Sequence, residues 1–129
     1  MKEIILDTET TGLSVKDGHR IVEIGCVEIE NLIPTKKSFH CYLNPHRKVS
    51  EAAIKVHGYT DEFLADKKKV SDVVDDFLQF IQNKRLVIHN AEFDISHINN
   101  ELKLIGKPSI SKDNVIDTLD IAREKFPGS

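Results

Sequence analysis

Acidic side chains follow two of the apolar segments of the sequence. Asp7 and Glu9 stand at the end of the β-branched segment at 3–7, and Asp94 comes shortly after the apolar segment at 86–89. Residues two apart on an extended chain point to the same side, so the carboxylates of Asp7 and Glu9 can converge beyond the end of a strand. Two such anions repel each other unless a proton or a cation lies between them. Oxygen ligands suit a divalent metal ion, so the spacing indicates a metal site, and the alternative is a solvated loop.

Asp94 lies at the expected start of a helix. Asn90 can cap this helix, and the helix dipole favours a carboxylate in the first turn, which by itself would explain Asp94. Both acidic positions nevertheless fall just past the ends of strands that should be neighbours in one sheet. Three carboxylates at one rim can hold two divalent ions for in-line attack on a phosphodiester, and we predict this chemistry here. Asp117 is either a supporting carboxylate of the same rim or the N-cap of a helix at 118–126, and we favour the cap.

The elements that must position these acids follow a simple order. Alternating and β-branched segments predict three strands with short connections, which favour an antiparallel meander. Further on, strands alternate with amphipathic helices, a pattern typical of parallel pairing. The sequence therefore predicts an α/β fold with a mixed sheet of about five strands flanked by helices. The expected strands are at 3–7, 20–30, 37–45, 86–89 and 114–117, and the expected helices are at 51–57, 71–84, 91–105 and 118–126, with a further turn at 61–64.

Composition bounds the class of protein. With 129 residues, 40% of them apolar and 30% charged, the chain has the size and balance of one globular domain spanning 1–129. A net charge of −3 counts against a protein that binds nucleic acid mainly through a basic surface. Cys26 and Cys41 lie in alternating apolar segments and are expected to be buried free thiols. No segment is long and apolar enough to cross a membrane, and we expect a cytoplasmic protein.

Five segments stand in a fixed order along the chain: DTETTGL at 7–13, IVEIG at 21–25, VHG at 56–58, HNAEFDI at 89–95, and the separated letters DTL, AR and FPG within 117–128. This set resembles the DnaQ-like 3'–5' exonucleases, and above all the proofreading branch that serves bacterial DNA polymerase III. The resemblance covers essentially the whole chain. It implies an RNase H-like fold for the predicted mixed sheet.

The resemblance also implies roles for individual residues. Asp7 and Glu9 would bind the catalytic ion, Asp7 would bridge to a second ion, and Asp94 would support that second ion, the two ions being Mg²⁺ or Mn²⁺. Family members use metal-activated water to release nucleoside monophosphates from the 3' end of single-stranded DNA. For His57 the alternative is a histidine at a helix C-terminus that is satisfied by carbonyls. The implied substrate-binding residues are Asp7, Glu9, Thr10, Leu13 and His57.

The chain departs from the family pattern at one motif. Active members carry a His-x4-Asp motif beyond the FPG segment, and residues 1–129 end before it, so we expect a C-terminally incomplete domain that lacks the C-terminal helix. The histidine of that motif is the general base, whose loss typically costs roughly 10²–10⁴ in rate, so we expect a poor nuclease or none. The alternatives are an inert module that binds a nucleic-acid end or a polymerase, and a relative that trims RNA. The implied partners are a single-stranded DNA 3' end, the polymerase III catalytic subunit and an accessory subunit.

Overall fold

A five-stranded mixed sheet forms the centre of the protein. The structure is a computed structural model that describes residues 1–125. The strand order is β3-β2-β1-β4-β5, with antiparallel pairing from β1 to β3 and parallel pairing of β1 with β4 and of β4 with β5. The predicted meander followed by parallel strands is thereby confirmed. The strands are β1 (Lys2–Thr10), β2 (Ile21–Glu30), β3 (Ile33–Tyr42), β4 (Arg85–Ile88) and β5 (Val115–Asp117).

The hairpin between β2 and β3 is tighter than the sequence suggested. The third strand was expected at 37–45, but β3 begins at Ile33, directly after Asn31 and Leu32. Both turn residues have positive φ angles, 52° and 69°. A two-residue turn with this backbone matches the twist of the flanking strands, so pairing continues almost to the turn.

Local capping signals place most of the helix ends. The Ser50 side chain accepts a hydrogen bond from Ala53 N, and Gly58 ends the same helix with a φ of 79°. Both features were expected, because a short polar side chain satisfies free N–H groups and glycine adopts the left-handed conformation without strain. The helix expected from Ser71 begins one residue earlier, at Val70. The helices are α1 (Glu51–His57), α2 (Asp61–Leu64), α3 (Val70–Ile81), α4 (Ala91–Leu104) and α5 (Thr118–Lys125), with single turns η1 (Val15–Asp17) and η2 (Lys112–Asn114).

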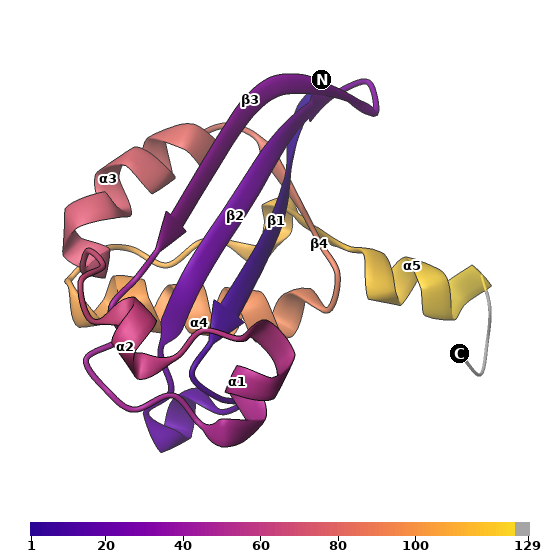
Figure 1. The fold of residues 1–129 in the computed structure, drawn as a ribbon. Coiled ribbons are helices and arrows are strands. Elements are labelled where there is room, and N and C mark those ends of the chain that lie inside the picture. The colour runs from indigo at the N-terminus through magenta and orange to yellow at the C-terminus, as the bar shows by residue number, and fades with distance from the viewer. Residues whose placement is uncertain (126–129) are drawn as a thin grey trace.

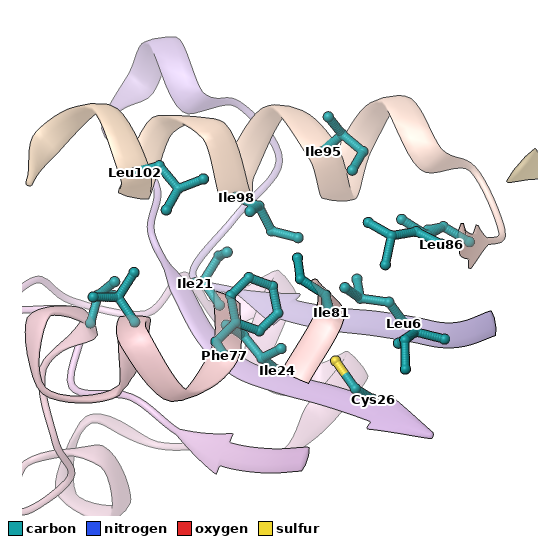
Figure 2. Packing of buried hydrophobic residues seen from close by; sticks show 14 of the residues in the cluster. Leu6, Ile21, Ile24, Cys26, Phe77, Ile81, Leu86, Ile95, Ile98 and Leu102 are labelled. Atoms are coloured by element: carbon teal, nitrogen blue, oxygen red, sulfur yellow. The ribbon is translucent and has the colours of Figure 1, made fainter. Parts of the chain in front are cut away.

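The hydrophobic core lies between the sheet and the two longest helices, α3 and α4. Figure 2 shows Leu6 and Ile24 of the sheet facing Phe77 of α3 and Ile98 of α4, all of them buried. In Figure 1, α3 and α4 lie on one side of the sheet, whereas α5 extends away from it. On the other side of β1 and β2, Ile5 and Val27 are about half exposed, and no helix of residues 1–125 covers them. The sheet therefore has one packed face and one partly open face.

The two cysteines are free thiols, as expected. Cys26 is buried and Cys41 is half-buried, and burial raises the pKa of the Cys26 thiol to about 12 and that of Cys41 to about 11. A thiol protonated at neutral pH is a weak nucleophile, so both act as core residues. Within the described part of the chain, no helix has the length and hydropathy needed to cross a bilayer. The FPG segment at 126–128 lies outside the described residues.

An ion pair joins the start of β2 to α4. The Arg20 guanidinium donates from Nε and Nη2 to the Glu101 carboxylate at 2.7–3.0 Å, and Ile21 N donates to the same carboxylate at 3.1 Å. Glu101 is 4% exposed. Its carboxylate satisfies both a cation and a buried backbone N–H, so it fixes the helix against the sheet.

Candidate active site

The end of β1 separates four consecutive side chains onto two faces. Thr8 and Thr10 are buried on the face that packs against the helices, whereas Asp7 and Glu9 lie on the partly open face. Across the ladder, Gly25 of β2 is the partner of Asp7. A Cβ atom placed on Gly25 would meet nothing nearer than the His40 ring at 4.0 Å, so the space beside Asp7 is open. The predicted pair of carboxylates on one side of the strand is therefore present and accessible.

Negative charge accumulates on this face. Glu9 stands opposite Glu23 of β2, which accepts hydrogen bonds from the Tyr59 hydroxyl at 2.9 Å and from His40 Nε2 at 2.6 Å. Burial raises the pKa of Glu9, and repulsion from Asp7 and Glu23 adds to the rise. A nearby cation stabilises the ionised form of a carboxylate whose pKa is raised in this way.

Asp94 reaches the rim from the opposite side of β1. It lies in the first turn of α4, is 4% exposed, and accepts a hydrogen bond from the Thr8 hydroxyl. Burial raises the pKa of Asp94 to about 6, the Thr8 hydrogen bond opposes the rise, and the charges of Asp7 and Glu9 add to it. The three acids are thus electrostatically coupled. In residues 1–125, however, no three His, Cys, Asp or Glu side chains are arranged so that they could hold one metal ion.

Thr8 belongs to the candidate site but was not predicted from the sequence. Its hydroxyl is the buried donor that orients Asp94, across 86 residues of chain. The signal was available in the alternation of the strand, because a residue between Asp7 and Glu9 must face the helices. What the sequence could not show is which helical residue it would meet.

The loop after β1 forms one wall of a pocket beside the acids. The Thr10 hydroxyl donates to the Gly12 carbonyl at 2.7 Å, and the Leu13 side chain is 83% exposed. Val56 of α1, 78% exposed, lines the same pocket, as do Glu9 and Phe93 of α4. The pocket measures about 480 Å³. The structure thus brings the predicted residues Thr10 and Leu13 to a cavity that adjoins Glu9.

His57 also lines this pocket, but it does not bond to the carbonyls of its own helix. Its Nε2 donates to the Thr10 carbonyl at 2.9 Å, and its Nδ1 accepts from Tyr59 N at 3.0 Å. Both ring nitrogens therefore have partners. The side chain connects α1 to the end of β1. The Tyr59 ring stacks on one face of the imidazole with the centroids 4.8 Å apart, so only the ring edge and the other face remain free for a ligand.

Asp117 caps two helices, α4 and α5. The sequence predicted a separate cap for each of them, Asn90 for α4 and Asp117 for α5. Its carboxylate accepts from Leu119 N at 2.9 Å, as expected for an N-cap, and also from Asn90 N and Ala91 N at 3.0 Å. The expectation that Asn90 caps α4 was wrong, because its side chain makes no capping hydrogen bond and its φ is 62°. Burial works to raise the pKa of Asp117, but these N–H donors outweigh it and lower the pKa. Asp117 thus serves two helix starts.

This sheet order, with acids at the end of the central strand, defines an RNase H-like α/β domain. A family model described as Exonuclease matches residues 4–129, and the chain belongs to that family, whose members generally use divalent metal ions. The chain is 50% identical, over 132 residues, to DNA polymerase III subunit epsilon of Rickettsia felis. The matched region covers 100% of the chain and 58% of that relative. It is 48% identical to the same subunit of Salmonella typhimurium, over 98% of the chain and 55% of the relative. The chain thus spans a little more than half the length of these relatives.

Solved structures share the fold. Exonuclease X, in complex with 5' overhanging duplex DNA, is 28% identical with a TM-score of 0.72, over 97% of this chain and 64% of that one. Exonuclease I of E. coli, in complex with a dT13 oligonucleotide, has a TM-score of 0.84 over 97% of this chain and 29% of that one. Its identity is 16%, so this similarity supports the fold alone. The resemblance to the proofreading exonucleases is confirmed.

Proposed function

We propose that residues 1–129 are the nuclease domain of a proofreading exonuclease that removes nucleoside monophosphates from the 3' end of single-stranded DNA. The observation that carries this proposal is the rim at the end of β1. There Asp7 and Glu9 lie on an open face, Asp94 is coupled to them by charge, and a pocket of about 480 Å³ adjoins Glu9. An anionic rim next to an apolar pocket fits a substrate with a phosphate and a base.

The acids are suited in type to hold Mg²⁺ or Mn²⁺. All are hard oxygen donors. Burial, together with repulsion among the acids, raises the pKa values of Glu9 and Asp94, so a bound cation would stabilise their ionised forms. We propose that Asp7 and Glu9 bind one ion and that Asp94 supports a second one. Bound ions supply Lewis acidity toward the phosphate. Thr8 orients Asp94, and Gly25 leaves the space that a phosphate group needs beside Asp7.

The pocket is suited to the terminal nucleotide. Leu13 and Val56 present apolar side chains to solvent from two different elements, an arrangement that buries apolar area only when a ligand enters. His57 presents its ring while its nitrogens hold the Thr10 carbonyl and Tyr59 N. The polymerase III catalytic subunit and an accessory subunit are the proposed protein partners, on the strength of the epsilon relatives.

Manganese binding should depend on Asp7. We expect wild-type protein to bind Mn²⁺ saturably and Asp7→Ala to bind it at least tenfold more weakly, because even groups behind a metal ligand contribute roughly 10–100-fold to affinity. Calorimetric titration checks this. Asp75→Ala, an exposed acid on α3, is the matched control and should bind as the wild type does. Equal affinity of the wild type and Asp7→Ala would contradict the proposed metal site.

An assay on a 3'-labelled oligonucleotide then decides between a nuclease and an inert module. Mn²⁺-dependent release of mononucleotides that Asp7→Ala abolishes supports the nuclease. Binding of the labelled strand without any release supports the inert module. Running RNA and DNA of the same sequence in parallel separates DNA proofreading from RNA trimming, because only the sugar differs between them.

A further inference from the structure

We infer that His97 is a positioning residue for the nucleotide pocket, holding the loop after β1 against α4. This inference rests on the proposed function, and it concerns a residue that no motif in the sequence pointed to. His97 lies in α4, three residues beyond Asp94 and four beyond Phe93. It therefore shares a helix face with the third carboxylate and with one wall of the pocket.

The contacts of His97 are specific and buried. The side chain is 1% exposed, and its Nε2 donates to the Leu13 carbonyl at 3.0 Å. Its ring centroid lies 4.7 Å from that of Phe93. Among the described residues its Nδ1 has no hydrogen-bond partner. Within residues 1–125, the bond to the Leu13 carbonyl is thus the one hydrogen bond of this buried imidazole, and it determines how the ring is held.

The rest of the loop is held from the other side. Thr11 N donates to the Arg20 carbonyl at 2.8 Å, and the Thr11 hydroxyl is hydrogen-bonded to His19 Nδ1 at 2.8 Å. Gly12 packs so closely on the His19 ring that an added Cβ would lie 2.3 Å from it. These contacts tie residues 11 and 12 to the start of β2. Leu13, the next residue, is tied to α4 by His97.

His97 consequently sets the distance between two walls of the pocket. The His97 ring contacts the Phe93 ring directly and is hydrogen-bonded to the backbone carbonyl of Leu13. One imidazole therefore positions two residues that line the pocket. Because the same helix carries Asp94, the pocket and the acidic rim are positioned together. Loss of the Nε2–H donor should loosen Leu13 and weaken nucleotide binding without altering the acids on β1.

Two substitutions separate the hydrogen bond from the bulk of the side chain. His97→Gln places an amide N–H near the position of Nε2, whereas His97→Leu fills the space and removes the donor. We expect His97→Leu to bind thymidine 5'-monophosphate roughly three- to tenfold more weakly in the presence of Mn²⁺, the effect of about one hydrogen bond. His97→Gln should stay close to the wild type. Mn²⁺ affinity should be equal in all three proteins, which a general loss of structure would not allow.

Amide hydrogen exchange of residues 11–14 in the free protein provides a second readout. His97→Leu should exchange faster there, and His97→Gln should not. His46→Asn, a change at an exposed histidine whose left-handed backbone suits asparagine, is the matched control. Unchanged binding and exchange in His97→Leu, or equal losses in both variants, would overturn the inference. If wild-type protein binds no nucleotide, the proposed pocket fails, and loop exchange alone then decides whether His97 holds the loop.

Discussion

Replacing Asp94 by asparagine is expected to stabilise the metal-free protein at pH 7. Burial, aided by the charges of Asp7 and Glu9, raises the pKa of Asp94 from 3.8 to about 6. The ionised form is therefore unfavourable in the folded state. Asparagine keeps an oxygen that can accept from Thr8 and removes the charge. One pKa unit corresponds to about 1.4 kcal/mol, so after allowance for solvent screening we expect a gain of about 1–3 kcal/mol.

The pH dependence gives this prediction its sign. Because the folded pKa lies above the unfolded one, the folded state binds the proton more tightly, so this group makes the wild type less stable as pH rises from about 4 to about 6. Urea unfolding with a chelator present should show the advantage of Asp94→Asn at pH 7 and its disappearance near pH 4. Asp75→Asn, at an exposed carboxylate of α3, is the control and should gain no stability at pH 7. Parallel curves for the wild type and Asp94→Asn would refute the prediction.

Metal should reverse the order. A ligand that binds only the folded state adds RT ln(1 + [L]/Kd) to stability. Mn²⁺ should therefore stabilise the wild type more than Asp94→Asn. The acidic site would thus lower the stability of the folded protein when it is empty and raise it when metal is bound. Functional residues often carry such a cost in stability.

Glu101→Ala is expected to lower the free energy of unfolding more than any of the substitutions named above. Removal of one partner of a buried ion pair typically costs about 3–5 kcal/mol, and because Arg20 is partly exposed we expect about 2–4 kcal/mol here. Arg20 would lose its carboxylate and the buried Ile21 N–H its acceptor. Urea unfolding measures the loss. The exposed pair of Lys107 and Asp75 provides the contrast, since Asp75→Ala should change stability by less than about 1 kcal/mol. A similar small effect for both variants would show that Glu101 does not fix α4.

The sequence predicted those parts of the fold that depend on neighbouring residues. Ser50 and Gly58 bound α1 as expected, because capping depends on the few residues around each helix end. The alternation of β1 correctly placed Asp7 and Glu9 on one face. The start of β3 at Ile33 was missed because two consecutive residues in the left-handed region are hard to foresee without glycine.

The contacts that complete the candidate site are distant in sequence and could not be predicted. Asp117 caps α4 from 26 and 27 residues away, taking the place assigned to Asn90. Thr8 binds Asp94 across 86 residues, and His97 binds Leu13 across 84. Each pairing depends on which helix residue the sheet meets, and that is decided by packing of the whole core. The types of residue in the site were readable, but their partners were not.

Contacts on the two sides of β1 differ in the chain entropy that is lost when they form. The pairing of β1 with β2 closes a short hairpin, whereas the contact between Thr8 and Asp94 closes 86 residues of chain. Each doubling of a flexible loop costs about 0.6 kcal/mol more in lost chain entropy. Asp7 and Glu9 already lie two residues apart on β1, which pairs locally with β2, whereas Asp94 joins them through one of the longest closures among the described residues. The candidate site lies where the two closures meet, so its geometry depends on local pairing and on completion of the whole sheet.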